Sequence, residues 1–308
     1  MKNLNNSLYI DTEHNATYRE LIVDLNLPDL EIVDDIQLAN IILASPPQIA
    51  AKLDTLPKLE WIQSIYAGVD AITSKEIEAD FTLTNVKGIF GQQISEYVIG
   101  YSLQYFRHFP QYSAQQSQQN WQQIPYETID SKCMLILGTG SIGNQVAKTA
   151  KAMGMKIIGL NRSGIPPHNS NFDDTYHIQE LEQSLSRANI IVSTLPHTEE
   201  TNALLNEKTL SYCKGALLFN VGRGATISEQ GLLMAIENKS ISHAFLDVFI
   251  NEPLAKDHSF WKHPSITITP HIAALSFPAQ VVDIFKENYL NFQSGFRLEY
   301  EVCLNRGY

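Results

Sequence analysis

Three ionisable side chains, Arg223, Glu252 and His271, are of the types that together reduce a carbonyl group. A protonated imidazole can donate a proton to a carbonyl oxygen on which negative charge grows. A nearby carboxylate keeps that imidazole charged near neutral pH, because an anion raises the pKa of a histidine. The rigid fork of a guanidinium can hold a carboxylate and polarise the carbonyl beside it. These types predict reduction of a 2-oxo acid, with His271 as general acid, Glu252 tuning it and Arg223 binding the substrate.

Each of these residues also has an ordinary structural interpretation. Arg223 could be a solvated turn residue, Glu252 an acid in the first turn of a helix, and His271 a hydrogen-bonded imidazole at a strand end. Their positions favour chemistry, because each follows a strand predicted for one sheet, and parallel α/β sheets bind ligands outside the carboxyl ends of their strands. The three predicted strands are Ala216–Val221, His243–Phe249 and Ser265–Thr269.

A glycine-rich turn follows the predicted strand Cys133–Leu137 and opens the amphipathic stretch Ile142–Met153. The first glycine of such a turn permits a tight bend, the second lets the backbone approach a pyrophosphate, and the third lets helix and strand pack closely. Free N–H groups at the start of the helix bind the phosphates. We therefore predict a dinucleotide cofactor, and a turn that binds nothing is the alternative. The residues of this GxGxxG turn are Gly138, Thr139, Gly140, Ser141, Ile142 and Gly143.

The residues after the next predicted strand, Lys156–Leu160, bear on the choice of cofactor. An Asp or Glu at this place accepts hydrogen bonds from the ribose hydroxyls of NAD. This chain has Asn161, Arg162 and Ser163 instead. All three can donate hydrogen bonds to a 2′-phosphate, and Arg162 adds positive charge. We expect NADP to be favoured, with NAD also used if Arg162 points to solvent.

A candidate for further contacts to the substrate carboxylate lies nearer the N-terminus. The loop Tyr66–Asp70 follows a predicted strand, Trp61–Tyr66, and the backbone N–H groups of Ala67 and Gly68 could form a small anion nest. Tyr66 could narrow this pocket or supply a hydroxyl group.

Strand-like and helical segments alternate along the chain, and this alternation predicts the elements that position these residues. Near-continuous apolar strands between helices are typical of a parallel sheet that is covered on both faces. Further strands are expected at Ser7–Ile10, Glu31–Val33, Asn40–Ala44, Thr82–Val86 and Asn189–Leu195. Further helices are expected over Gln179–Ala188 and Ser228–Asn238, and from Pro278 to about Ser294.

The middle of the chain is expected to hold one long helix followed by polar surface. Ser95 is a predicted N-cap, large apolar residues follow it at helical spacing, and Pro110 is expected to end the helix. Residues 111–123 contain seven glutamines and no periodic apolar face, so we expect a solvated helix or loop there.

Composition excludes several classes of protein. The chain has 308 residues, of which 44% are apolar, so it is not disordered and we expect about two domains. A net charge of −11 without a cluster of Lys and Arg argues against a nucleic-acid partner. No window approaches about 18 uninterrupted apolar residues, so we expect no membrane partner. Three widely spaced cysteines predict neither a disulfide framework nor a metal site. Together with an N-terminus that lacks an apolar signal segment, they favour the cytoplasm.

These motifs resemble those of the D-isomer-specific 2-hydroxyacid dehydrogenase family over nearly the whole chain. The spacing of Arg223, Glu252 and His271 is the specific part, because many oxidoreductases share the glycine-rich turn. The modest length and the Asn161–Ser163 element are more similar to the glyoxylate/hydroxypyruvate reductase branch than to NAD-linked lactate enzymes. The other segments that carry the resemblance are Tyr66–Asp70, Asn85–Glu96, Leu195–Thr201, Val221–Gly224, Glu252–Leu254 and His271–Ala274.

The resemblance implies a domain division and further site residues. Residues 98–274 would form a Rossmann cofactor domain, inserted into a smaller flavodoxin-like α/β substrate domain made of residues 1–97 and 275–308. Asp247 would contact the nicotinamide carboxamide, and Ala67 and Gly68 would bind the substrate carboxylate. The family also implies a homodimer and a product of D configuration. The other cofactor-binding residues that it implies are Leu195, Pro196, Thr201, Val221, Gly222 and His271.

Two other functions stay open. The family fold also serves as a transcriptional corepressor, so the chain could sense NAD(P)H as an interaction protein with little turnover. It could also oxidise another small anion, such as phosphite or formate. The complete set of Arg223, Glu252 and His271 favours the reductase.

Overall fold

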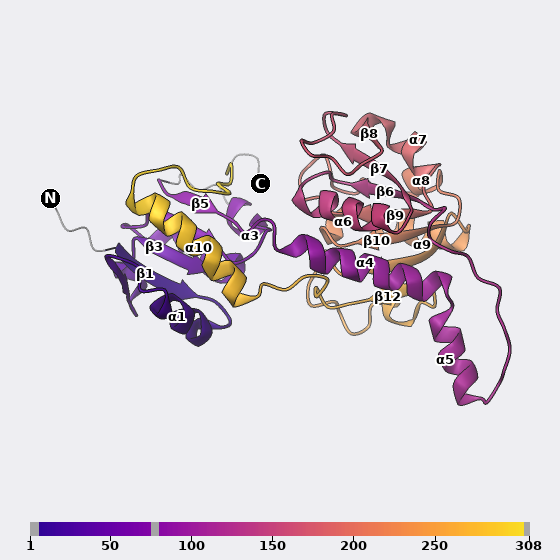
Figure 1. The fold of residues 1–308 in the computed structure, drawn as a ribbon, viewed down its shortest axis with the longest axis horizontal. Coiled ribbons are helices and arrows are strands. Elements are labelled where there is room, and N and C mark those ends of the chain that lie inside the picture. The colour runs from indigo at the N-terminus through magenta and orange to yellow at the C-terminus, as the bar shows by residue number, and fades with distance from the viewer. Residues whose placement is uncertain (1–5, 75–79, 305–308) are drawn as a thin grey trace. The chain divides into compact units, whose positions relative to one another are not determined.

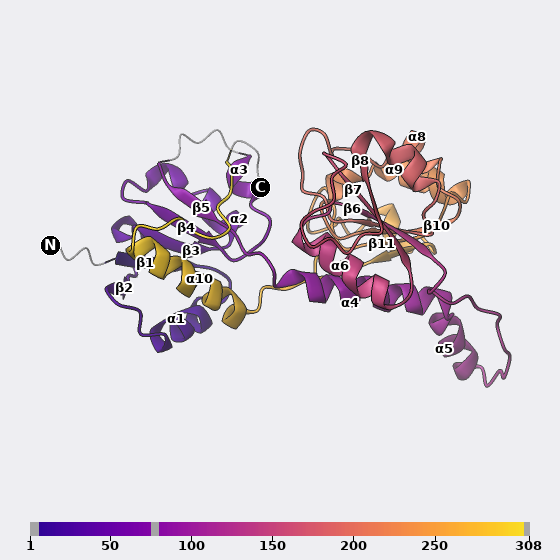
Figure 2. The same ribbon diagram turned by 45° about the horizontal axis from the view of Figure 1, so that its top comes forward.

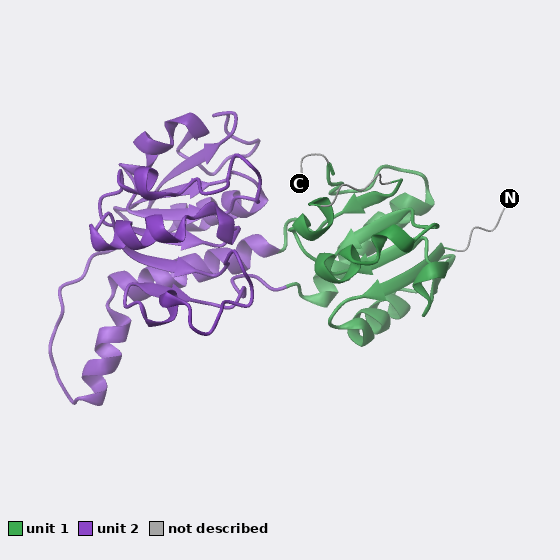
Figure 3. Ribbon diagram, turned by 180° about the vertical axis from the view of Figure 1, so that it is seen from behind, with its two compact units in different colours: residues 1–89, 276–308 green, residues 90–275 purple. Residues whose placement is uncertain are grey.

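The computed structural model describes residues 6–74 and 80–304, and the chain divides into two compact units (Figure 3). Unit 1 contains residues 1–89 and 276–308, and unit 2 contains residues 90–275. Each unit has its own parallel sheet, which confirms the expected α/β class. The assignment of a substrate role to one part of the chain and a cofactor role to the other stays a prediction. Within the described residues, none of the helices has the length and apolar character needed to cross a membrane.

The sheet of unit 1 has five parallel strands in the order β2-β1-β3-β4-β5 (Figure 1). This is the flavodoxin-like order, in which the neighbours β1 and β3 mark the switch point of the topology. All five strands expected in this part of the chain are confirmed, with small shifts at their ends. They are β1 (Asn6–Asp11), β2 (Leu30–Ile32), β3 (Ile41–Ala44), β4 (Trp61–Ser64) and β5 (Thr82–Thr84).

Two layers of helices cover this sheet, because its strands are apolar on both sides. α1 and α10 pack together on one face (Figures 1 and 2), where the Trp61 and Phe285 rings stack with centroids 5.2 Å apart. α2 and α3 cover the other face, where Ile49 and Ile72 join the strand residue Ile62 in one core. The helices of unit 1 are α1 (Asn15–Asp24), α2 (Pro46–Ala50), α3 (Asp70–Thr73) and α10 (Pro278–Gln293).

The sheet of unit 2 has seven parallel strands in the order β12-β11-β10-β9-β6-β7-β8. Taken from β8, this is the doubly wound order 3-2-1-4-5-6 with one more strand at the edge. The topology reverses between β6 and β9, which is where such sheets bind ligands. The strands are β6 (Cys133–Leu137), β7 (Lys156–Asn161), β8 (Asp174–His177), β9 (Ile190–Ser193), β10 (Ala216–Asn220), β11 (Ile241–Leu246) and β12 (Ile266–Ile268).

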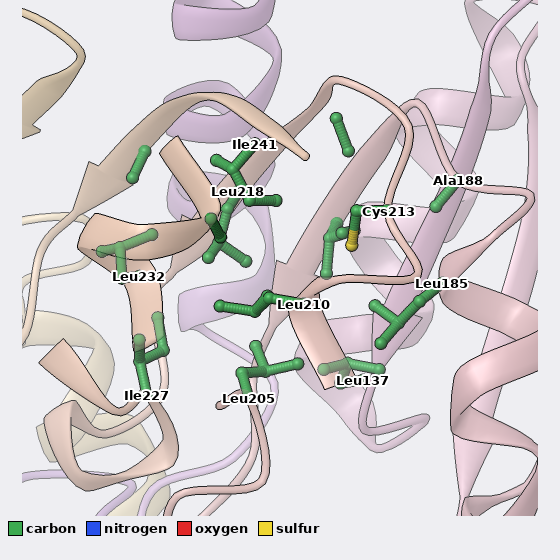
Figure 4. Packing of buried hydrophobic residues seen from close by; sticks show 14 of the residues in the cluster. Leu137, Leu185, Ala188, Leu205, Leu210, Cys213, Leu218, Ile227, Leu232 and Ile241 are labelled. Atoms are coloured by element: carbon green, nitrogen blue, oxygen red, sulfur yellow. The ribbon is translucent and has the colours of Figure 1, made fainter. Parts of the chain in front are cut away.

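Alternate strand side chains of unit 2 enter two different cores. Leu135 and Leu137 join the apolar residues of α7, α8 and α9 on one face (Figure 4). Ile136 points to the other face, where α6 packs on the sheet and α4 packs on α6. The helices of unit 2 are α4 (Phe90–Phe106), α5 (Phe109–Ser117), α6 (Ser141–Ala152), α7 (Leu181–Leu185), α8 (Glu207–Leu210) and α9 (Glu229–Glu237).

Two predictions about the long helix are wrong. α4 begins at Phe90, so Ser95 is not an N-cap, and its hydroxyl donates to the Gly91 carbonyl inside the helix at 2.6 Å. Pro110 does not end α4, which stops at Phe106, but lies in the first turn of α5, where no backbone N–H is needed. α5 has no buried residue and extends away from the sheet of unit 2 (Figures 1 and 2), which confirms a solvated helix at the start of the glutamine-rich segment.

Two further elements of unit 2 differ from the sequence-based expectation. β8 was not predicted, because its residues are polar and half-buried at the edge of the sheet. The single helix expected over Gln179–Ala188 is a 3₁₀ turn, Ile178–Glu180, followed by the short α7. The 3₁₀ turn is capped at its start, because the Glu180 carboxylate accepts the backbone N–H of His177 at 2.9 Å.

The stacking of Trp61 on α10 predicts that unit 1 depends on the C-terminal helix for its stability. Phe285→Ala should lower the free energy of unfolding by about 3–5 kcal/mol, the cost of emptying a fully buried aromatic site. Urea unfolding followed by fluorescence measures this, with Trp121→Phe and Trp261→Phe in the background so that only Trp61 reports. Leu290→Ala, on the same helix but 41% exposed, is the control and should cost much less. Equal losses in the two variants would contradict the prediction.

Candidate active site

His271 and Glu252 form a hydrogen-bonded pair after the carboxyl ends of β12 and β11. Nδ1 of His271 lies 2.8 Å from Oε2 of Glu252, while Oε1 of Glu252 accepts the backbone N–H of Phe249 at 2.8 Å. An ionised carboxylate only accepts hydrogen bonds, so Nδ1 carries a proton. The His271 side chain is 52% exposed, and no described residue bonds to its Nε2. Nε2 is therefore the atom that can exchange a proton with a bound molecule.

The pair favours the charged form of both partners. The hydrogen bond that His271 donates to Glu252 raises the pKa of His271 above its ordinary value, and partial burial opposes this effect without cancelling it. Burial also pushes the pKa of Glu252 upward, but the hydrogen bonds from His271 and Phe249 outweigh it, so the pKa of Glu252 lies below its ordinary value. The pair therefore shifts His271 toward its charged form.

Arg223 lies in the turn after β10, and close packing on both sides fixes its backbone. A Cβ atom added at Gly222 would lie 2.6 Å from the carbonyl oxygen of Leu195, and one at Gly224 would lie 2.0 Å from the carbonyl carbon of Phe249. Only glycine fits at either position. The charge of Arg223 lowers the pKa of both members of the His271–Glu252 pair, so the three predicted catalytic side chains lie in one electrostatic neighbourhood.

Asn220, which is not among the predicted site residues, belongs to this turn. Its Nδ2 donates to the Arg223 carbonyl at 2.9 Å, and its Oδ1 accepts the N–H of Gly222 at 3.3 Å. Nη1 of Arg223 in turn donates to the Gly222 carbonyl at 2.7 Å. The sequence pattern that could have identified Asn220 is a polar residue at the end of an apolar strand, directly before the turn.

Asp247, at the end of β11, holds the segment that carries His271. Its carboxylate is buried, and Oδ1 accepts the hydroxyl of Thr269 at 2.6 Å and the N–H of Ile272 at 2.8 Å. Oδ2 accepts the N–H of Ala273 at 2.9 Å, and the Asp247 carbonyl accepts the N–H of His271 at 2.9 Å. These bonds stabilise His271 at a φ of 55°, a left-handed conformation that is uncommon outside glycine. The expected contact of Asp247 with a nicotinamide carboxamide stays a prediction.

The glycine-rich turn has the shape that a dinucleotide requires. Gly138 has a φ of 98°, and a Cβ atom at Gly143 would lie 2.0 Å from the Gly138 carbonyl oxygen, so both positions demand glycine. A Cβ atom at Gly140 would meet nothing within 4 Å, which leaves room beside the start of α6. Thr139, Ser141 and Ile142 complete the turn, and its free N–H groups fit a pyrophosphate.

The side chain of Asn161 organises the loop after β7. Its Nδ2 donates to Oγ1 of Thr139 at 2.9 Å and to the carbonyl of Ile165 at 2.8 Å. Its Oδ1 accepts the N–H groups of Ser163 at 3.0 Å and Gly164 at 2.7 Å. The Asn161 amide thus bonds both to the glycine-rich turn and to its own loop, and it shapes that loop. Contact of Asn161, Arg162 or Ser163 with a 2′-phosphate stays a prediction.

The remaining predicted cofactor residues lie on loops after β9 and β10. The hydroxyl of Thr201 donates to the Pro196 carbonyl at 2.7 Å and accepts the N–H of Thr198 at 2.9 Å, which closes the loop after β9. Leu195 packs against Gly222 in the turn that Val221 begins after β10. β9 neighbours β6 in the sheet at the point where the topology reverses, and β10 lies on the other side of β9. Contact of these residues with a cofactor stays a prediction.

Ala67 and Gly68 belong to unit 1, whereas Arg223, Glu252 and His271 all belong to unit 2. Their loop follows β4, and its shape is fixed by hydrogen bonds within unit 1. The Ala67 carbonyl accepts Nδ2 of the buried Asn85 at 2.7 Å, and the Ser64 hydroxyl bonds to both the N–H and the carbonyl of Tyr66 at 2.9 Å. The N–H groups of Ala67 and Gly68 stay predicted donors to a carboxylate.

Comparison with known proteins gives matches over both units. An A-type glyoxylate/hydroxypyruvate reductase from Serratia proteamaculans is 34% identical over 246 residues, which are 77% of this chain and 78% of that protein. A crystal structure of a D-isomer specific 2-hydroxyacid dehydrogenase family protein from Aeromonas salmonicida is 41% identical, with a TM-score of 0.92 over 97% of this chain and 99% of that one.

A third protein shares the fold at lower identity. An NADPH-dependent glyoxylate/hydroxypyruvate reductase from Sinorhizobium meliloti, in complex with NADP and sulfate, is 24% identical with a TM-score of 0.88 and covers 98% of this chain and 100% of that one. Residues 99–273 match the family model for the NAD-binding domain of D-isomer specific 2-hydroxyacid dehydrogenases. On these matches, the chain belongs to the D-isomer specific 2-hydroxyacid dehydrogenase family.

Proposed function

We propose that this enzyme reduces small 2-oxo acids, such as glyoxylate and hydroxypyruvate, to D-2-hydroxy acids with NADPH. The hydrogen bond between His271 and Glu252, with Arg223 on the neighbouring strand end, is the observation that carries the proposal. The substrate class is supported by the relative from Serratia proteamaculans, which is named for those two acids.

A bound nicotinamide cofactor supplies the hydride, which goes to the carbonyl carbon of the substrate. His271 donates the proton on Nε2 to the carbonyl oxygen as negative charge grows there. Glu252 holds His271 in its charged form until that transfer and keeps the ring oriented through Nδ1. Arg223 binds the substrate carboxylate with its guanidinium group, and the N–H groups of Ala67 and Gly68 are further donors to that carboxylate.

Unit 2 is the proposed cofactor domain. It would distinguish NADPH from NADH by the 2′-phosphate, which only NADPH carries. Arg162 and Ser163 are the proposed ligands of the 2′-phosphate, on a loop that Asn161 keeps in shape. The expected homodimer, cytoplasmic location and D configuration of the product stay predictions.

His271→Ala tests the proposal directly. With NADPH and glyoxylate, hydroxypyruvate or pyruvate, the wild-type chain should oxidise the cofactor, and the variant should lose about 10²–10⁴-fold in kcat, the typical contribution of a general acid. Cofactor binding, followed by NADPH fluorescence, should be retained. His168→Ala, at an exposed position, is the control. Tight NADPH binding without turnover of any 2-oxo acid by the wild type would instead favour a cofactor-sensing protein.

Glu252→Gln should move the pH profile of reduction. Activity requires protonated His271, so it is lost as the pH rises through the raised pKa of that residue. The variant removes the negative charge that raises this pKa, so the loss should begin at lower pH. Glu229→Gln is a matched control, because Glu229 pairs with another histidine, His258, at 3.2 Å. An unmoved profile for Glu252→Gln would remove Glu252 from its proposed role.

Arg162→Gln should weaken the preference for NADPH. The loss of charge-assisted hydrogen bonds to a phosphate predicts a fall of about 10- to 100-fold in the ratio of kcat/KM for NADPH over NADH. Lys148→Gln, which removes the same charge from an exposed position on α6, is the control and should leave the ratio unchanged. A wild-type ratio below one, or equal ratios in the two variants, would contradict the assignment of Arg162.

A further inference from the structure

Helix α4 forms hydrogen bonds to both ends of the segment that carries His271. Near its start, Nε2 of Gln93 donates to the Leu275 carbonyl at 3.0 Å, and Oε1 of Gln93 accepts the Leu275 N–H at 2.9 Å. One turn later, the hydroxyl of Tyr97 lies 2.8 Å from Oγ1 of Thr269. Gln93 and Tyr97 are four residues apart and therefore share one face of the helix. This face contacts residues 269 and 275, on either side of His271.

The bond from Tyr97 continues to the buried carboxylate of Asp247. Oγ1 of Thr269 donates to Oδ1 of Asp247 at 2.6 Å. The single hydroxyl proton of Thr269 therefore goes to Asp247, and Tyr97 donates to Thr269. Burial raises the pKa of Tyr97, so its hydroxyl keeps the proton that this bond needs. Hydrogen bonds in series inside a protein strengthen one another.

His271 needs this support because of its backbone conformation. A non-glycine residue at a φ of 55° persists only where its surroundings hold it. Asp247 holds the middle of the segment through the N–H groups of Ile272 and Ala273. Tyr97 is held in turn by its ring, which packs edge-on against Tyr101 with centroids 4.8 Å apart. Hydrogen bonds thus connect Tyr97 on α4 to the backbone of His271 through Thr269 and Asp247.

We propose that Tyr97 and Gln93 are positioning residues for proton transfer, acting through Thr269 and Leu275 on the place of His271 beside Glu252. The kinetic part of this inference rests on the proposed reductase activity, whereas its structural part does not. Without the bonds from α4, the segment 269–275 relaxes and the Nδ1 bond to Glu252 loosens. The pKa of His271 then falls toward its ordinary value.

The experiment measures the pKa of His271 by NMR titration, with the signal assigned by its absence in His271→Ala, and kcat with NADPH and glyoxylate. Tyr97→Phe, Thr269→Val and Gln93→Ala should each lower that pKa and reduce kcat about three- to tenfold, the effect of one lost hydrogen bond. KM for NADPH should not change. Thr269→Ser, which keeps the hydroxyl, should retain most of the wild-type kcat and the wild-type pKa.

Matched controls come from the same helix. Tyr101→Phe removes a hydroxyl that bonds to no described residue, and Gln92→Ala removes an amide that contacts Glu96 and Gln145 instead of Leu275. Neither should change the pKa of His271 or kcat. If Tyr97→Phe does not fold, Gln93→Ala compared with Gln92→Ala decides the question, because Gln93 bonds to Leu275 from the same face of the helix.

Unchanged pKa and kcat in Tyr97→Phe and Gln93→Ala would overturn the inference and leave α4 a purely structural helix, even if Thr269→Val, which also loses the bond to Asp247, changes both. A wild-type chain that reduces no 2-oxo acid would overturn the proposed function instead. The NMR titration would then still test whether α4 positions His271.

Discussion

The carboxylate of Asp247 is buried at the end of β11 and accepts three hydrogen bonds, from Thr269, Ile272 and Ala273. A buried carboxyl group without hydrogen-bond partners would destabilise the fold, and these three bonds remove that cost. Together with the Asp247 carbonyl, they fix the left-handed backbone of His271. The geometry of the imidazole, and hence its bond to Glu252, depends on this one buried side chain.

Arg223 and Glu252 are coupled in a different way, through Phe249. Gly224 packs against the backbone of Phe249, and the N–H of Phe249 donates to the Glu252 carboxylate. A side chain at position 224 would therefore displace the group that orients Glu252. The turn after β10 packs directly against the turn after β11. This contact fixes the backbone that carries Arg223 relative to the backbone that carries Glu252.

Periodicity and turn chemistry predicted most of this fold, since apolar strands such as β6 and β10 are buried on both faces. These patterns give a wrong prediction where a strand is only half-buried, or where tertiary packing overrides the N-cap propensity of a residue. β8 is a polar edge strand, and Ser95, although serine is a favoured residue type at N-caps, lies inside a helix. The candidate site residues Arg223, Glu252 and His271 could be predicted because each follows a strand. The hydrogen bonds of Asp247, Asn220 and Asn161 to nearby backbone groups could not be predicted. They depend on which backbone groups the fold brings within hydrogen-bond distance.

The discontinuous make-up of unit 1 has a consequence for the order of events during synthesis. The sheet face that carries Trp61 is covered by α10, whose first residue is Pro278. The ribosome must make all of unit 2 first, which takes roughly 10–40 s at about 5–20 residues per second. Throughout that interval the sheet of unit 1 exposes an uncovered apolar face, whereas all residues of unit 2 have been made before synthesis of α10 begins. The nascent chain is therefore most prone to aggregate through its N-terminal part, and chaperone binding should be concentrated there.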